Sequence, residues 1–197
     1  MTVIAAITGG IGSGKSTFSN EVIKRKIKLL DSDEIVSQIY KKPNKEFISL
    51  LNKIGLKNAV FKNKIDKKYI SNKIFSDKKT KVKLERYIFK KVRQIRKNFI
   101  LKGKKKKEKI MFVDIPLLFE NNLSKDFDIV FSIISNKQNR YKRLKKTKKL
   151  SKELFNKIIK TQTTDLVRIK KSDIIIKNNG TMEEYLKKIN NILDKVI

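Results

Sequence analysis

The most informative segment of this chain is Gly9-Gly10-Ile11-Gly12-Ser13-Gly14-Lys15-Ser16, which matches the pattern G-x-x-x-x-G-K-[S/T] without a gap. The pattern carries weight when it lies between a strand and a helix. A β-branched, apolar run at residues 3–8 comes before it, and a helical pattern extends from Lys15 to about Lys26. Glycines let successive backbone N–H groups curl around phosphate oxygens, where side chains would collide. The segment therefore predicts a phosphate-binding loop.

The residues of this loop suggest how a nucleoside triphosphate such as ATP would be bound. Lys15 is expected to reach the β- and γ-phosphates, and the hydroxyl of Ser16 is expected to bind Mg²⁺. Thr17 begins a helix whose partial positive end faces the same anion, and it is expected near the α-phosphate. The predicted nucleotide-binding residues of the loop are Gly12, Ser13, Gly14, Lys15, Ser16 and Thr17. The loop alone leaves the reaction open.

Strand patterns alternate with helical patterns over much of the chain, which is typical of a parallel, doubly wound α/β sheet. Further strands are expected at residues 27–30, 110–113, 127–134 and 173–176. Residues 36–100 look helical throughout, and a later helix is expected to carry both Phe155 and Leu166. Thr181 and Glu184 form a capping-box pattern that opens the final helix.

We therefore predict one domain of the P-loop kinase type, with an inserted helical substrate lobe and a helical lid. The expected core comprises residues 1–35, 108–136 and 172–197, with the lobe at about 36–107 and the lid at about 137–171.

Three aspartates follow predicted strands, whose carboxyl ends share the edge of the sheet where the loop lies. Asp33 is our choice for the residue that orients and deprotonates the attacking hydroxyl, because phosphoryl transfer needs such a group. Asp114 fits a Walker-B-like role in holding Mg²⁺, and a carboxylate that simply ends a buried strand is an equally open interpretation. Asp31 is better interpreted as a helix N-cap or turn residue.

Arginines flank a lysine-rich helical hairpin in the C-terminal half, at Arg140, Arg143 and Arg168. Nucleotide kinases commonly place arginines on a mobile lid that closes over the phosphates and excludes water. We assign a catalytic role to Arg143, while a solvated basic face stays the alternative interpretation for each of the three.

The composition excludes several kinds of chemistry. The 197 residues contain no cysteine and no histidine, so disulfides, thiolate metal sites and imidazole acid–base catalysis are ruled out. The N-terminus lacks the features of a signal peptide, and no segment approaches the ~20 apolar residues that cross a bilayer. We expect a soluble, cytoplasmic protein without a membrane partner, whose catalytic base is a carboxylate, lysine, tyrosine or water.

The net charge is high, since 50 basic and 19 acidic residues give +31. Such a field would attract RNA, anionic membranes or phosphorylated metabolites. The excess is mostly lysine spread along the chain and accompanied by isoleucine and asparagine, a combination that a coding sequence rich in A and T produces without regard to function. We favour that interpretation and expect no dedicated nucleic-acid partner.

Four blocks resemble the dephospho-coenzyme A kinase family in order and spacing, and together they span nearly the whole chain. They are residues 7–17, Asp31-Ser32-Asp33-Glu34-Ile35, Asp114-Ile115-Pro116-Leu117-Leu118-Phe119-Glu120, and the set Gln162, Arg168, Asp173, Asn178 and Gly180. The resemblance implies transfer of the γ-phosphate of ATP to the ribose 3′-hydroxyl of dephospho-coenzyme A, with Asp33 as base. It also implies that the helical lobe grips the substrate and that Asn178 lies near the adenine of ATP.

The chain departs from this family at two places. The family's lid usually carries an arginine and an aspartate four and five residues after the position of Arg143, where this chain has Thr147 and Lys148. The lobe has Phe89-Lys90 where the family usually has a His-Pro pair. Lysine lacks the planar fork of arginine, so the substituted lid bears on catalytic rate more than on identity.

Two alternatives to this interpretation stay open. One is a related nucleoside or nucleotide kinase with another acceptor, and the other is a nucleotide-gated RNA-binding protein that uses the high positive charge. The sequence leaves the oligomeric state open as well.

Overall fold

The computed structural model describes residues 1–196 and separates into two compact units. The first unit comprises residues 1–31 and the chain from Ile100 onward, and the second comprises residues 32–99. The boundaries that the sequence suggests for a substrate lobe and a lid stay predictions.

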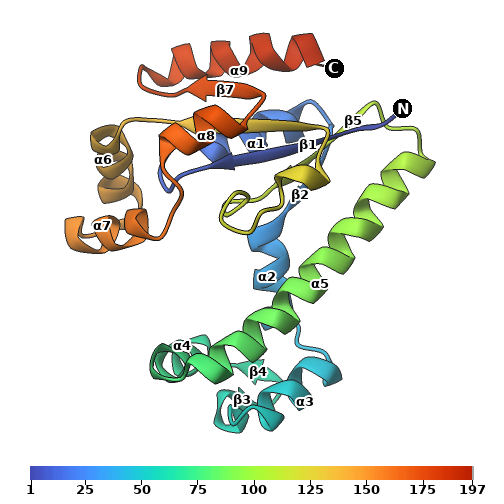
Figure 1. Ribbon diagram of the computed structural model, residues 1–197, viewed down its shortest axis with the longest axis vertical. Coiled ribbons are helices and arrows are strands. Elements are labelled where there is room, and N and C mark those ends of the chain that lie inside the picture. The colour runs from blue at the N-terminus through green and yellow to red at the C-terminus, as the bar shows by residue number, and fades with distance from the viewer. Residues whose placement is uncertain (197) are drawn as a thin grey trace. The chain divides into compact units, whose positions relative to one another are not determined.

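The first unit is built on a five-stranded parallel sheet with the strand order β2-β5-β1-β6-β7 (Figure 1). Its strands are β1 (Val3–Gly9), β2 (Lys28–Asp31), β5 (Ile110–Asp114), β6 (Ile129–Ile134) and β7 (Ile174–Lys177). In the register of the sheet, Ile7 lies opposite Asp114 and Gly9 lies opposite Ile133. The predicted parallel, doubly wound sheet is confirmed, and the end of β1 lies where the chain order reverses, the usual position of a ligand site.

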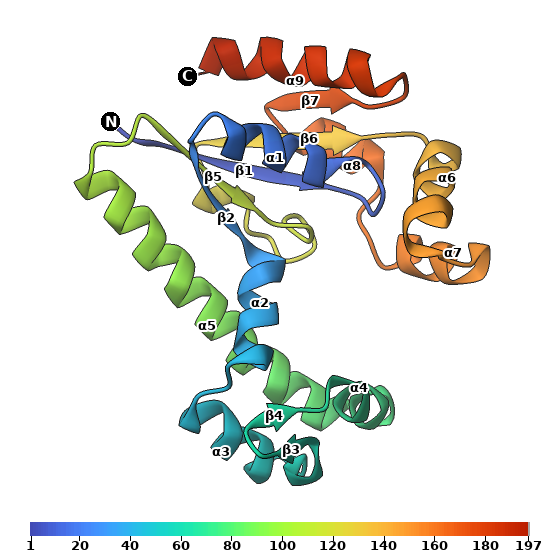
Figure 2. The same cartoon turned by 180° about the vertical axis from the view of Figure 1, so that it is seen from behind.

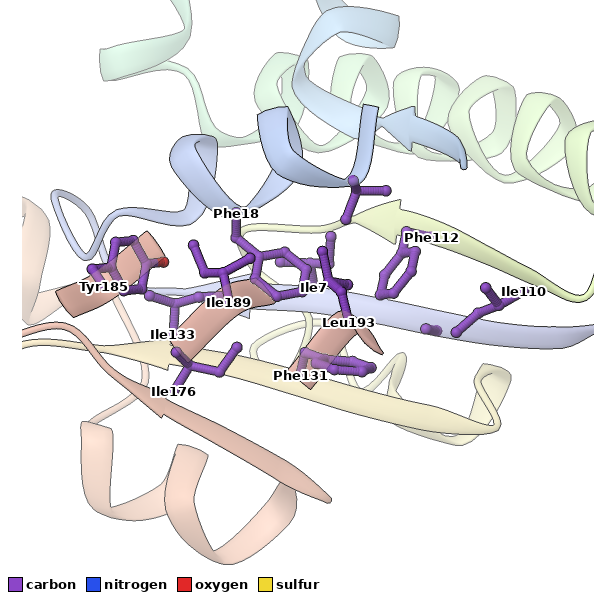
Figure 3. Close-up of a cluster of buried hydrophobic side chains, with 12 residues drawn as sticks. Ile7, Phe18, Ile110, Phe112, Phe131, Ile133, Ile176, Tyr185, Ile189 and Leu193 are labelled. Atoms are coloured by element: carbon purple, nitrogen blue, oxygen red, sulfur yellow. The ribbon is translucent and has the colours of Figure 1, made fainter. Parts of the chain in front are cut away.

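The core of this unit lies between the sheet and two helices, α1 (Lys15–Lys24) and α9 (Met182–Val196), as Figure 3 shows. Phe18 of α1 packs against Phe112 and Phe131, with ring centroids 5.9 and 5.7 Å apart. Helix α9 contributes the buried side chains Tyr185, Ile189 and Leu193. This packing fixes the start of α1, and hence the phosphate-binding loop, on the sheet.

The start of α9 has the predicted capping box. The N–H of Thr181 donates to Glu184 Oε2 at 3.1 Å, and the N–H of Glu184 donates to Thr181 Oγ1 at 3.2 Å. Each side chain thereby satisfies one backbone donor that the helix leaves without a partner.

The connection between β6 and β7 contains α6 (Lys137–Lys148), α7 (Lys152–Lys160) and α8 (Asp165–Lys171). Helices α6 and α7 lie beyond the carboxyl end of β6 (Figure 2). The prediction of one helix containing both Phe155 and Leu166 is wrong, because the first lies in α7 and the second in α8. Thr164 starts the second helix by accepting a hydrogen bond from the N–H of Val167 at 3.4 Å. A polar cap of this kind interrupts a helix without disturbing the apolar spacing.

The second unit is mainly helical and has its own apolar core. Its elements are α2 (Ser32–Lys41), α3 (Lys45–Lys53), η1 (Lys57–Ala59), β3 (Val60–Phe61), β4 (Lys64–Ile65), α4 (Lys67–Ser76) and most of α5 (Lys78–Lys105). Its buried apolar residues are Phe47, Leu51, Leu56, Ala59, Ile70, Leu84 and Ile88.

The sequence did not predict the β3–β4 hairpin of the second unit. Each of its strands has two residues, too few for an alternating pattern to be recognised. Its turn residues Lys62 and Asn63 have φ of 44° and 60°, the left-handed conformation that two-residue hairpin turns require.

Across residues 1–196, none of the helices has the length and apolar character needed to cross a membrane. Cytoplasmic location and the lack of a membrane partner stay predictions.

Candidate active site

The phosphate-binding loop joins β1 to α1, as the sequence predicts. Gly12 and Gly14 have φ of 74° and 103°, a left-handed conformation that residues with a Cβ adopt only with strain. In the described part of the chain, no protein acceptor binds the backbone N–H groups of Gly12, Gly14, Lys15 and Ser16. Successive N–H groups of this kind, at the start of a helix, form an anion-binding site.

The carbonyl groups of the same loop are held by side chains from the C-terminal third of the chain. Four consecutive carbonyl oxygens each accept a hydrogen bond: Ile11 O from Arg140 Nε at 2.8 Å, Gly12 O from Arg143 Nη1 at 3.4 Å, Ser13 O from Asn178 Nδ2 at 2.8 Å, and Gly14 O from the Tyr185 hydroxyl at 3.0 Å. Because the carbonyls are bound to the protein, the conformation that presents the loop N–H groups is held before any ligand arrives.

Helix α6 packs directly on this loop. A Cβ placed on Gly12 would lie 2.8 Å from the carbonyl oxygen of Arg140 and 2.9 Å from Leu144 Cδ1. The guanidinium of Arg140 would collide with a Cβ on Gly10 as well. The glycines therefore serve two purposes, since they permit the backbone conformation of the loop and leave room for α6.

Arg143 and Asn178, which the sequence assigns to catalysis and to adenine binding, contact each other. Nη2 of Arg143 donates to the backbone oxygen and to Oδ1 of Asn178, both at 3.0 Å, and Nη1 donates to Ser135 Oγ at 3.1 Å. Both residues therefore belong to the support of the phosphate-binding loop. Their predicted contacts with ATP stay predictions.

Arg140 and Arg168 are buried, so neither belongs to a solvated basic face. Arg168 is 1% exposed, and its guanidinium pairs with Asp165 at 2.9 Å and with Glu120 at 3.5 Å. Arg140 lies 3.7 Å from the same Asp165, and burial lowers the pKa of its guanidinium. These ion pairs tie α6, α8 and the segment after β5 together beneath the loop.

Lys15 and Asp114 form an ion pair beside the loop. Nζ of Lys15 contacts Asp114 Oδ1, and the hydroxyl of Ser19 donates to Oδ2 at 2.9 Å. Asp114 is 2% exposed, and Asp31 lies opposite it in the neighbouring strand. Burial raises the pKa of the Asp114 carboxyl, and the negative charge of Asp31 adds to this, whereas Lys15 and Ser19 oppose it.

The oxygen atoms near the loop suit Mg²⁺. The predicted ligands, the Asp114 carboxylate and the exposed Ser16 hydroxyl, are hard oxygen donors of the kind this ion prefers. No cluster of three or more Asp, Glu, His or Cys side chains within residues 1–196 could form a complete metal cage. Proteins commonly hold Mg²⁺ through one or two side chains together with phosphate oxygens and water, and the binding of Mg²⁺ by Ser16 and Asp114 stays a prediction.

Asp33, the predicted base, belongs to the second unit. It is an exposed residue in the first turn of α2, two residues along the chain from Asp31 at the end of β2. Its catalytic role stays a prediction.

Two residues that hold the loop were not assigned a role from the sequence. Tyr185 lies on the buried face of the amphipathic helix α9, where a sequence pattern indicates only a core position. Oε1 of Gln162 accepts a hydrogen bond from the N–H of Ile11 at 2.9 Å, and the only signal for it was its place in the C-terminal pattern.

Taken together, a G-x-x-x-x-G-K-S loop at the end of a central parallel strand, with its lysine paired to an aspartate on the adjacent strand, defines a P-loop kinase. Solved structures show the same fold. A shikimate kinase from Acinetobacter baumannii has the same fold, with a TM-score of 0.52 and 14% identity over 99% of this chain and 95% of that one.

A family model and proteins of higher sequence identity identify the particular family. A family model described as dephospho-CoA kinase matches residues 3–184, and the chain belongs to this family. It is 36% identical to a dephospho-CoA kinase of Fusobacterium nucleatum subsp. nucleatum, over 98% of both chains. The structure of a dephospho-CoA kinase from Campylobacter jejuni is similar too, with a TM-score of 0.77 and 27% identity over 100% of this chain and 98% of that one. The chain is therefore a transferase of the kinase type.

Proposed function

We propose that this protein transfers the γ-phosphoryl group of ATP to the ribose 3′-hydroxyl of dephospho-coenzyme A, giving coenzyme A and ADP, the last step of coenzyme A biosynthesis. The observation that carries the proposal is the braced phosphate-binding loop, with Lys15 and Asp114 beside it, in a chain that matches the dephospho-CoA kinase family over residues 3–184. We expect the reaction to take place in the cytoplasm, without a membrane or dedicated nucleic-acid partner.

Each residue near the loop has a proposed task. The N–H groups of residues 12–17 and the Lys15 ammonium bind the β- and γ-phosphates of ATP, which requires Lys15 to exchange Asp114 for phosphate oxygens. Ser16 and Asp114 would hold Mg²⁺, which would neutralise phosphate charge when bound with ATP. With no histidine in the chain, Asp33 accepts the proton of the attacking hydroxyl.

Arg143 and Asn178 are proposed to act at the nucleotide. Their hydrogen bonds to Gly12 O and Ser13 O place their side chains against the loop. From there, Arg143 is proposed to stabilise phosphate charge and Asn178 to lie near the adenine. Thr147, at one of the two lid positions that depart from the family, donates to the carbonyl oxygen of Arg143 at 2.8 Å and supplies no charge.

Asp33→Asn tests the assignment of the base. We expect kcat with ATP and dephospho-coenzyme A to fall by roughly 100-fold or more, the usual range for loss of a general base, with little change in binding of a non-hydrolysable Mg-ATP analogue. Asp66→Asn is the matched control, because Asp66 caps α4 through the N–H of Tyr69 at 2.9 Å and asparagine caps equally well. An Asp33→Asn enzyme with the kcat of the wild type would remove Asp33 from the mechanism.

A further inference from the structure

Gln162 lies in the short connection between α7 and α8, and its side chain is directed to the phosphate-binding loop. Oε1 accepts a hydrogen bond from the N–H of Ile11 at 2.9 Å, and Nη2 of Arg140 lies 3.5 Å from the same oxygen. The backbone N–H of Gln162 separately donates to Ile159 O at 3.1 Å and completes the end of α7. The side chain is therefore not needed for the helix end, and its oxygen instead contacts the loop at Ile11 and α6 at Arg140.

Ile11 is bound on both of its backbone polar groups. Its N–H donates to Gln162, and its carbonyl oxygen accepts from Arg140 Nε at 2.8 Å. Arg140 lies in the first turn of α6, and Gln162 lies two residues after the end of α7. The two ends of the α6–α7 hairpin, residues 137–162, are thus fastened to one residue of the loop.

The base of this hairpin is held firmly by other contacts. Arg140 is 5% exposed and pairs with Asp165, and Leu144 packs against Gly12. Beside Gln162, the N–H of Thr163 donates to Glu120 Oε1 at 2.6 Å. Gln162 therefore lies in a well-anchored part of the chain, from which its side chain holds the N–H of Ile11.

We propose that Gln162 is a positioning residue that couples the α6–α7 hairpin to the phosphate-binding loop and thereby sets the affinity for the nucleotide. Its bond fixes the Gly10–Ile11 peptide, next to the Ile11–Gly12 peptide that Arg140 holds, and so helps to set the direction of the following N–H groups that would bind phosphate. The inference rests on the proposed use of this loop to bind ATP, but it is independent of the acceptor.

Gln162→Met tests the proposal, because methionine keeps the length of the side chain and removes the acceptor oxygen. We expect a dissociation constant about tenfold higher for a non-hydrolysable Mg-ATP analogue, measured by calorimetry without an acceptor, since one partly buried donor of the loop loses its partner. Amide hydrogen exchange across residues 9–14 should become faster. In turnover, KM for ATP should rise by a similar factor while KM for dephospho-coenzyme A stays near its wild-type value.

Three further variants make the result specific. Gln162→Glu keeps an acceptor for Ile11 and should bind the analogue closer to wild type than Gln162→Met does. Gln162→Asn, whose oxygen is withdrawn by one methylene, should resemble Gln162→Met and replaces it if that variant does not fold. Gln138→Met is the matched control, because Gln138 is an exposed residue in the same hairpin.

The outcomes separate this inference from the proposed function. Equal affinity and equal hydrogen exchange in wild type and Gln162→Met would overturn the role of Gln162 and leave the kinase proposal intact. A wild-type protein that fails to bind the analogue would overturn the use of the loop itself, and with it both proposals.

Discussion

Tyr185 illustrates at the scale of one residue how the protein shapes its phosphate-binding loop. Its ring is buried in the core with Phe18 and Ile189, and its hydroxyl donates to Gly14 O at 3.0 Å. Burial raises the pKa of Tyr185 above its ordinary value of 10.0, and the charge of Arg143 opposes this. The phenol therefore stays protonated and remains a donor to the loop even at alkaline pH.

Tyr185→Phe should reveal this raised pKa through the pH dependence of stability. In the wild type, the unfolded chain loses the phenolic proton near pH 10 while the folded chain keeps it, so this contribution is complete below about pH 10 and is lost as pH rises further. The variant lacks the contribution. We expect its free energy of unfolding to be lower by about 1 kcal/mol at neutral pH, for one lost hydrogen bond, and the gap to shrink above about pH 10. Urea unfolding of both proteins from about pH 8 to about pH 11 measures this difference in the free energy of unfolding. A difference that stays constant over this range would contradict the prediction.

The position of the loop between a strand and a helix could be predicted from the sequence, but the way in which distant side chains support it could not. The residues from Gly9 to Ser16 are contiguous, and their spacing alone indicates a phosphate-binding loop. The supporting side chains bond to the loop across 129, 131, 165 and 171 residues, so no local pattern could pair them. Tyr185 in particular has the sequence signature of an ordinary core residue.

At the scale of the elements, the contact between α6 and the loop shows that glycine can be required for two different reasons. One is a left-handed backbone conformation, and the other is room for a neighbouring helix. Gly12 and Gly55 both have left-handed φ, 74° and 81°, but a Cβ on Gly12 would collide with α6, whereas a Cβ on Gly55 would meet nothing within 4 Å. The same substitution at these two sites therefore distinguishes backbone strain from loss of packing.

Gly12→Ala and Gly55→Ala should have different consequences. Gly55→Ala should lower the free energy of unfolding by roughly 1–2 kcal/mol, the cost of a left-handed alanine, and Gly12→Ala should lower it by more because its Cβ also collides with α6. Only Gly12→Ala should also lose ATP binding, because α6 and the loop must move apart. Thermal unfolding and calorimetry with a Mg-ATP analogue measure the two effects, and normal binding by Gly12→Ala would show that the contact with α6 does not matter.

The elements that the sequence predicted best are the strands of the parallel sheet. Their buried, β-branched runs are long enough to recognise, and each observed strand differs from its predicted range by no more than two residues at either end. The β3–β4 hairpin was missed because its strands have two residues each. The break between α7 and α8 was missed because Thr164 caps a new helix while the apolar spacing continues.

At the scale of the whole molecule, the residues proposed for the reaction are distributed over both compact units. The phosphate-binding loop belongs to the first unit, and the proposed base, Asp33, begins the second. The net charge of +31 favours the approach of ATP and dephospho-coenzyme A, both anionic, although salt screens such fields beyond about 8 Å at physiological ionic strength. The compositional origin of the lysine excess and the absence of a dedicated nucleic-acid partner stay predictions.

The most direct test of the central claim is an ATP-consumption assay on the full chain with Mg²⁺ and dephospho-coenzyme A, run beside adenosine, AMP and an acceptor-free control. We predict ADP formation only with dephospho-coenzyme A, a product heavier by one phosphate that NMR places on the ribose 3′-oxygen, and no turnover in Lys15→Ala. Turnover with AMP or adenosine but not with dephospho-coenzyme A would contradict the proposed substrate. No ADP formation with any acceptor, although ATP binds, would contradict the assignment as a kinase.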